Sequence, residues 1–116
     1  MKLREPVLDL VKLRTFRVVA ATGSFTRAAA NLGYSQSNVT TQIQSLEREL
    51  GAPLFERVSR NVALTDVGRR TLEYAERLLA LAEEAKAAVG RQRELSGPDP
   101  STTPSDKAPA SKPALK

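Results

Sequence analysis

Residues 23–51 read GSFTRAAANLGYSQSNVTTQIQSLERELG, and the second half of this stretch decides the fold. Val39, Ile43, Leu46 and Leu50 recur at spacings of four, three and four, which places them on one face of a helix. Ser35 stands just ahead of them and is a candidate N-cap, because its hydroxyl can accept a hydrogen bond from the first turn. The pattern predicts a helix after Ser35 with one buried apolar stripe.

The opposite face of this helix carries small, uncharged polar side chains. At about 100° per residue, the side chains that point away from the stripe, or lie beside that direction, are Ser37, Thr41, Gln44, Arg48, Asn38, Thr40 and Ser45. Solvated helix faces more often carry Lys, Glu and Arg, whereas Ser, Thr and Asn are poorer helix formers. Amides and hydroxyls can bond base edges and phosphate oxygens, so this face is typical of a helix that contacts DNA.

A shorter helix precedes it. Ser24 is its candidate N-cap, and Gly33 supplies the break before the next helix, since glycine readily adopts positive φ. Its inner face is formed by Phe25, Ala28, Ala29 and Leu32. Two short helices joined this tightly predict a helix-turn-helix unit. The alternative is an ordinary helical hairpin in a small α-domain.

Residues 54–57 and 62–64 read as two short strands around a polar turn at 58–61. A hairpin in this place is a wing. Arg57 and Arg60 lie at its base and tip, where a guanidinium can meet phosphate or enter a narrow minor groove. The alternative is two solvated arginines on a loop.

Thr65 and Asp66 begin a long helix, because one can cap it and the other suits its macrodipole. A helix from residue 66 to about 93 would be about 42 Å long. Its apolar residues form two stripes, one with Val67, Tyr74, Leu78, Leu81 and Ala85, the other with Leu72, Ala75, Leu79 and Ala82. One stripe can close the core, and the other calls for the same helix of a second copy or for a further part of its own chain. The predicted dimerisation residues are Leu72, Ala75, Leu79, Leu81 and Ala82.

In this order and spacing, five motifs resemble the LysR-type transcriptional regulators: LRTF at 13–16, GSFTRAA at 23–29, SQSNVTTQI at 35–43, LERELGAPLFER at 46–57 and LTDVG at 64–68. The resemblance covers about residues 9–86 and concerns that family's N-terminal winged helix-turn-helix and linker helix. It implies a mainly α fold, with three helices, a short β-hairpin wing and a long linker helix. A single-domain regulator similar to the winged-helix part of the molybdate-responsive family is an alternative that fits LFER and LTDVG less well.

The resemblance implies that Gln36, Ser37, Asn38, Thr40 and Thr41 face the major groove and that the two arginines serve the wing. The full set of predicted DNA-binding residues is Thr26, Arg27, Ser35, Gln36, Ser37, Asn38, Thr40, Thr41, Gln44, Arg48, Arg57 and Arg60. The family often has Pro in place of Ser37 and Arg in place of Thr41, so this chain lacks one possible bidentate reader of guanine.

The charge distribution agrees with a nucleic-acid partner. The chain has 18 Lys and Arg against 13 Asp and Glu, and the whole net charge of +5 falls within residues 1–70. A localised positive field attracts polyphosphate and supplies the part of affinity that does not depend on sequence. Aromatic residues make up only 4% of the chain, which disfavours a base-stacking platform for single strands or RNA.

An enzymatic function is disfavoured by composition. The chain contains no His and no Cys, so it lacks the commonest general base and the usual nitrogen and sulfur ligands of metals. No glycine-rich phosphate loop is present. We expect no catalytic residue, no cofactor and no metal site.

With neither a signal peptide nor an apolar run long enough for a membrane span, we expect a cytoplasmic, nucleoid-associated protein.

The chain divides into four expected parts: an N-terminal extension at 1–8, the winged helix-turn-helix domain at 9–65, the linker and dimerisation helix at 66–94, and a Pro- and Ser-rich disordered tail at 95–116. We expect neither the effector-binding region of such regulators nor a small-molecule site. The leading hypothesis is a homodimer that reads an inverted repeat in double-stranded DNA. The rival is an interaction module whose long helix captures a full-length regulator.

Overall fold

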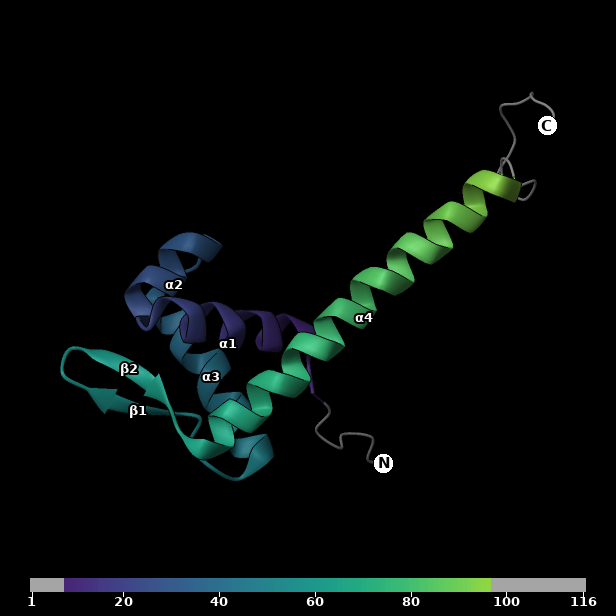
Figure 1. Ribbon diagram of the computed structural model, residues 1–116. Helices are drawn as coiled ribbons and strands as arrows, with labels where there is room; N and C mark the ends of the chain where they lie inside the picture. Colours follow the sequence, from purple (N-terminus) through teal and green to yellow (C-terminus); the bar gives the residue numbers. More distant parts are fainter. Residues whose placement is uncertain (1–7, 97–116) are drawn as a thin grey trace, which may run out of the picture. The chain divides into compact units, whose positions relative to one another are not determined.

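The computed structural model describes residues 8–96 (Figure 1), and the order of elements confirms the predicted architecture. The chain forms α1 (Leu10–Thr22), α2 (Phe25–Leu32), α3 (Gln36–Leu50), β1 (Phe55–Val58), β2 (Asn61–Leu64) and α4 (Asp66–Ser96). The chain divides into two units, of which the first ends at Leu79 and the second begins at Ala80. The extension predicted at 1–8 and the tail predicted at 95–116 lie almost wholly outside the described residues, although α4 includes residues 95 and 96.

The first three helices begin at side-chain caps and end at left-handed glycines. Ser24 accepts a hydrogen bond from the backbone N–H of Arg27 at 3.1 Å, and Ser35 accepts one from that of Asn38 at 3.1 Å. Both predicted caps are thereby confirmed, and Asp9 caps α1 in the same way. Each of these helices ends at a glycine with positive φ, namely Gly23, Gly33 and Gly51.

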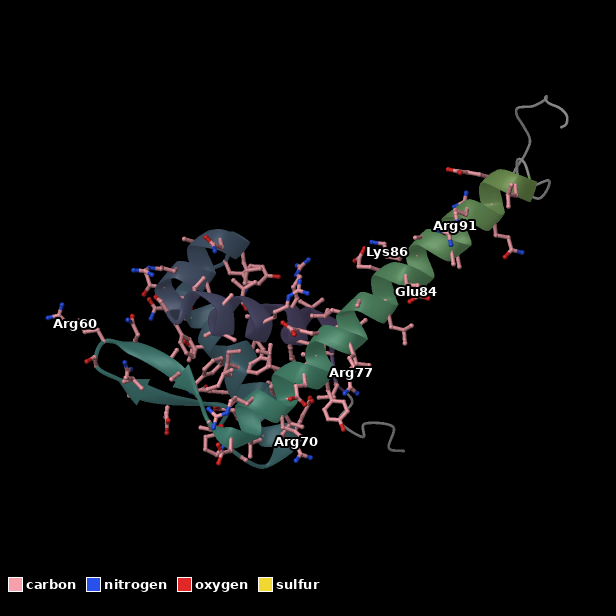
Figure 2. All side chains as sticks on the ribbon, in the orientation of Figure 1. Arg60, Arg70, Arg77, Glu84, Lys86 and Arg91 are labelled. Carbon is pink, nitrogen blue, oxygen red and sulfur yellow. The ribbon has the colours of Figure 1, made fainter. Side chains whose placement is uncertain are left out.

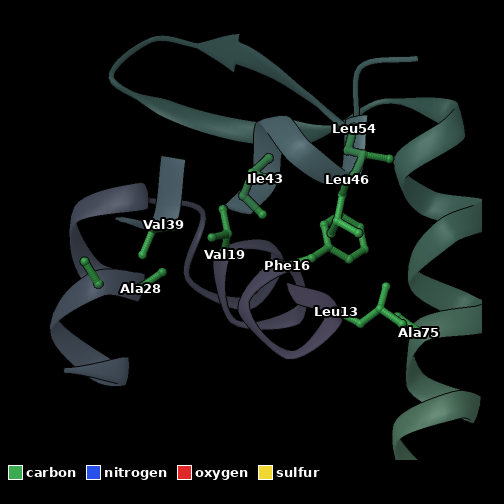
Figure 3. Close-up of a cluster of buried hydrophobic side chains, with 10 residues drawn as sticks. Leu13, Phe16, Val19, Ala28, Val39, Ile43, Leu46, Leu54 and Ala75 are labelled. Atoms are coloured by element: carbon green, nitrogen blue, oxygen red, sulfur yellow. The ribbon is translucent and has the colours of Figure 1, made fainter. Parts of the chain in front are cut away.

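The core lies where α1 crosses α2, α3 and the start of α4 (Figure 3). It consists of Leu13, Phe16, Val19, Ala28, Ala29, Val39, Ile43, Leu46, Leu54 and Ala75. The predicted inner stripe of α3 is correct for its first three members, but Leu50 is 39% exposed. It is the last residue of α3, where the chain turns at Gly51.

Three aromatic rings join the hairpin to the helices. The rings of Phe16 and Phe55 are 5.4 Å apart at their centroids, and those of Phe25 and Phe55 are 5.8 Å apart in an edge-on arrangement. Such pairs add about 0.5–1.5 kcal/mol beyond the area they bury. Through Phe55, therefore, β1 is packed against both α1 and α2.

The predicted wing is a two-stranded antiparallel hairpin in which Phe55 faces Leu64 and Val58 faces Asn61. Its loop is only Ser59 and Arg60, shorter than the predicted four-residue turn. Ser59 has φ of 57° and Arg60 does not have positive φ, the pattern of a type II′ turn. The backbone N–H of Val62 donates to the carbonyl of Gly23 at 3.0 Å, which ties β2 to the turn between α1 and α2.

The start of α4 is held against the segment that leads into β1. The backbone N–H of Thr65 donates to the carbonyl of Leu54 at 3.0 Å, and its hydroxyl donates to the carbonyl of Pro53 at 2.7 Å. The same hydroxyl caps the helix by accepting from the N–H of Gly68 at 2.9 Å. Thr65 is thus the predicted cap and also closes the hairpin.

Only one of the two apolar stripes of α4 faces the core. Ala75 is fully buried, and Leu72 and Leu79 are half-buried against the core cluster. The prediction that Ala75 serves dimerisation is wrong, because its own chain leaves it no surface for a partner. The other stripe is exposed, with Tyr74 at 51% and Leu81 at 59%.

Gly68 permits the close approach of α4, so Gly68→Ala should lower stability. A β-carbon at this position would overlap the carbonyl oxygen of Leu54 and lie 3.0 Å from Cδ2 of Leu64. Overpacking of this kind costs about 1–3 kcal/mol. Urea unfolding followed by circular dichroism measures the loss. Gly90→Ala is the matched control, because within residues 8–96 no atom outside the adjacent backbone of its own helix lies within 4 Å of the added carbon, and helix propensity improves. Equal stability of the two variants would contradict the packing argument.

Thr15 buries a hydroxyl without a bond, so Thr15→Val should be neutral or stabilising. The residue is fully buried, and within residues 8–96 its Oγ1 has no hydrogen-bond partner. Removing an unsatisfied group of this kind gains up to about 1 kcal/mol. In contrast, the hydroxyl of Thr22, the last residue of α1, donates to the carbonyl of Val18 at 3.0 Å and accepts from the N–H of Ser24 at 3.3 Å. Thermal unfolding should therefore show Thr22→Val as the less stable variant, and the reverse order would refute this reading.

Candidate nucleic-acid interface

The outer face of α3 is polar and open, as the periodicity predicted. The exposed residues on and just before this helix include Ser35, Gln36, Ser37, Asn38, Thr41, Gln44 and Arg48, whereas Thr40 is half-buried. Ser45 is half-buried too, and its hydroxyl accepts a hydrogen bond from Nζ of Lys12 at 2.8 Å. Ser45 therefore joins α3 to α1 and is not part of the free polar face.

Two amides at the start of α3 are held by other side chains. The Thr26 hydroxyl donates to Oε1 of Gln36 at 3.0 Å, and Nε2 of Gln42 donates to Oδ1 of Asn38 at 3.0 Å. In both pairs the residue at the start of α3, Gln36 or Asn38, accepts the hydrogen bond through its amide oxygen. Each bond consequently favours one orientation of its amide before any ligand arrives.

Ser35 has a structural task as well as a predicted contact. Its hydroxyl accepts from the backbone of Asn38 as the N-cap and lies 3.3 Å from Oγ of Ser37. The predicted contacts at the start of α3 are thus connected to one another through the cap.

A depression of about 390 Å³ lies between the helix-turn-helix and the wing. The predicted site residues that line it are Thr26, Gln36, Thr40, Gln44, Arg57 and Arg60. Three segments far apart in sequence supply them: the start of α2, the outer face of α3, and the hairpin. The structure thereby brings half of the predicted site into one continuous surface.

Other predicted residues lie outside this depression. They are Arg27, Ser35, Ser37, Asn38, Thr41 and Arg48. Arg48 and Gln44 instead border a shallower hollow beside the end of α3 with Pro53. Asn61 lines the main depression although sequence reasoning assigned it only to the turn. Its position next to the predicted wing tip was the available signal.

The two wing arginines supply free positive charge. Arg57 and Arg60 are exposed, and in the described part of the chain neither has a carboxylate within 4.0 Å. Figure 2 shows Arg60 at the tip of the hairpin. Glu47 and Glu56 also line the depression, but Oε2 of Glu47 accepts the backbone N–H of Leu54 at 2.8 Å. That carboxylate therefore holds the connection between α3 and β1.

The exposed stripe of α4 within the first unit consists of Val67, Tyr74 and Leu78, and the guanidinium of Arg77 lies 5.0 Å from the centre of the Tyr74 ring. Leu81 continues the same spacing at the start of the second unit, where Ala82 is half-buried. The dimerisation role of Leu72, Leu79, Leu81 and Ala82 stays a prediction.

No group of three or more His, Cys, Asp or Glu side chains within residues 8–96 is arranged to hold a metal ion. Over the same residues, no helix is both long enough and apolar enough to cross a bilayer.

Known proteins share this fold and sequence pattern. Residues 10–69, just over half of the chain, match the family of bacterial regulatory helix-turn-helix proteins called the lysR family. The uncharacterised HTH-type transcriptional regulator YwqM of Bacillus subtilis (strain 168) is 46% identical over 90 residues, which are 78% of this chain and 31% of that protein. The HTH-type transcriptional regulator GltR of the same organism is 43% identical over 91 residues, again 78% of this chain and 31% of the relative. The chain therefore spans less than a third of the length of these relatives.

Solved structures agree. The complex of BenM DBD with catB site 1 DNA has a TM-score of 0.69 at 39% identity, covering 72% of this chain and 93% of that chain. A CbnR DBD complex with DNA has a TM-score of 0.69 at 37% identity, covering 78% of this chain and 100% of that chain. With the family match over residues 10–69 and the relatives above, these comparisons show that the chain belongs to the lysR family of bacterial regulatory helix-turn-helix proteins.

Proposed function

We propose that this chain is a sequence-specific, double-stranded DNA-binding module of a transcriptional regulator. The observation that carries the proposal is the surface shared by the starts of α2 and α3 and the wing, where polar donors meet two arginines that form no ion pair within residues 8–96. A helix of this kind enters the major groove with its first residues toward the bases, while a wing meets the adjacent backbone or minor groove.

Within this proposal, residues 9–65 form the DNA-binding domain and residues 66–94 the linker and dimerisation helix. Gln36, Ser37, Asn38, Thr40 and Thr41 face the bases. Thr26, Arg27, Ser35, Gln44, Arg48, Arg57 and Arg60 contact the backbone or position the reading residues. In this proposal the chain binds chromosomal DNA in the bacterial nucleoid and catalyses no reaction.

The proposed active form is a homodimer. The exposed apolar stripe on α4, with Tyr74, Leu78 and Leu81, suits a second copy of the same helix, since two copies bury each other's stripes. Two recognition helices related by a two-fold axis require a DNA site with inverted symmetry.

DNA binding should depend on both sequence and salt. Duplexes enriched from a random pool should bind the chain more tightly than shuffled duplexes in a fluorescence anisotropy titration. Arg60→Gln should weaken binding on all sequences about equally and make the slope of log K against log salt shallower by about one, the value for a single phosphate. Arg91→Gln, at an exposed arginine of α4 that is not among the residues lining the depression, is the matched control. Affinity that responded to neither sequence nor salt would refute the proposal.

Dimerisation should fail when a charge enters the exposed stripe. Leu81→Glu should shift the chain from dimer to monomer in sedimentation velocity, because a buried carboxylate without a partner is costly. Ala87→Glu places the same charge on an exposed residue of α4 about 120° from Leu81 around the helix axis. A dimer that survived Leu81→Glu, or that was lost equally with Ala87→Glu, would place the interface elsewhere.

A further inference from the structure

We propose that Thr26 is a positioning residue that holds the Gln36 amide with its nitrogen toward DNA and so makes this position prefer guanine to adenine. The inference rests on the proposed DNA-binding function and extends it to base preference. Its basis is the single hydrogen bond from Oγ1 of Thr26 to Oε1 of Gln36, 3.0 Å long, which joins the two helices of the helix-turn-helix unit.

Both ends of this bond have a well-defined backbone. Thr26 is the second residue of α2, and Gln36 is the first residue of α3. The N-caps Ser24 and Ser35 hold the two helix starts by bonds to the N–H groups of Arg27 and Asn38. Thr26 and Gln36 are exposed, and both line the depression beside the wing. The pair therefore lies on the proposed DNA-facing surface in a fixed relation.

A glutamine can read a base in two ways. Its amide recognises adenine with two bonds, accepting from N6 through the oxygen and donating to N7 through the nitrogen. Alternatively, its NH₂ group alone donates to acceptors, which are O6 and N7 together on guanine but only N7 on adenine and only O4 on thymine, so donation favours guanine. Thr26 takes one of the two lone pairs of the oxygen and directs the nitrogen away from itself, so the two-bond arrangement with adenine is disfavoured relative to donation through the nitrogen.

The neighbouring amide has the same polarity. Oδ1 of Asn38 accepts a hydrogen bond from Nε2 of Gln42, so the NH₂ group of Asn38 is likewise left available as a donor. Among the described residues, neither the nitrogen of Gln36 nor that of Asn38 has a hydrogen-bond partner. The start of α3 consequently presents donors to its surroundings, which fits base edges that carry acceptors.

Selection from a random pool of double-stranded DNA, followed by sequencing, tests the proposal on the full chain. Gln36→Ala first identifies the base pair that Gln36 reads, as the position where preference disappears. At that position, Thr26→Val and Thr26→Ala should raise the enrichment of adenine relative to guanine about tenfold, because the freed oxygen can accept from N6. Thr26→Ser keeps the hydroxyl and should keep the preference of the natural chain. The double variant Thr26→Val with Gln36→Ala should match Gln36→Ala alone.

The other outcomes overturn the inference in distinguishable ways. An unchanged preference in Thr26→Val means that the hydroxyl does not set the amide. A shift in Thr26→Ser as large as in Thr26→Val assigns the effect to packing. If Gln36→Ala weakens binding without changing any base preference, Gln36 contacts phosphate. If the natural chain enriches no sequence at all, the proposed function fails together with this inference.

Discussion

The junction between Thr65, Leu54 and Gly68 is the constraint on which the first unit depends. One threonine bonds the segment before β1 through its N–H and its hydroxyl and also begins α4. The missing side chain of Gly68 lets the first turn of α4 touch the carbonyl of Leu54. Leu54 itself is fully buried in the core. A displacement at this contact therefore also shifts the base of the wing, the first turn of α4 and the core residues of α1. The hairpin has only two short strands, which are marginal alone, and it is stable here because this junction and Phe55 fasten it at its base.

The proposed interface separates charge from hydrogen-bonding detail. Free guanidinium groups sit on the wing, whereas the start of α3 carries hydroxyls and amides. Arginines on the wing act over several ångströms and depend on salt, while amides act only at contact distance and in one orientation. Bonds from Thr26 and Gln42 favour one orientation of each amide in advance, which lowers the side-chain entropy that is lost when DNA binds. Wing and helix thereby contribute different parts of recognition.

Local patterns in the sequence were enough to predict α2, α3, the hairpin and the start of α4 with their caps, whereas α1 was implied only by the family resemblance and its cap Asp9 was missed. The stripe at Val39, Ile43 and Leu46, the caps at Ser24, Ser35 and Thr65, and the hairpin all follow from spacing within a few residues. What failed or was missed depends on distant segments. Periodicity could not decide which stripe of α4 faces the core, and so Ala75 was misassigned. Periodicity also could not show that Leu50, at the end of α3, is exposed and not packed in the core. The bond between Thr26 and Gln36 links two helices through a turn, and only their crossing geometry brings it about.

The connections between elements decide where this domain can change its length. A left-handed glycine ends α1 and the cap of α2 is the next residue, while only Tyr34 separates the corresponding pair before α3. A residue inserted in either place would separate the glycine that ends one helix from the N-cap that begins the next. The apolar face of the following helix would then no longer point into the core. The loop of Ser59 and Arg60 caps no helix and is exposed on both sides. Natural insertions and deletions in this part of the domain are therefore expected to gather at the wing tip, where relatives can vary their reach without rebuilding the rest.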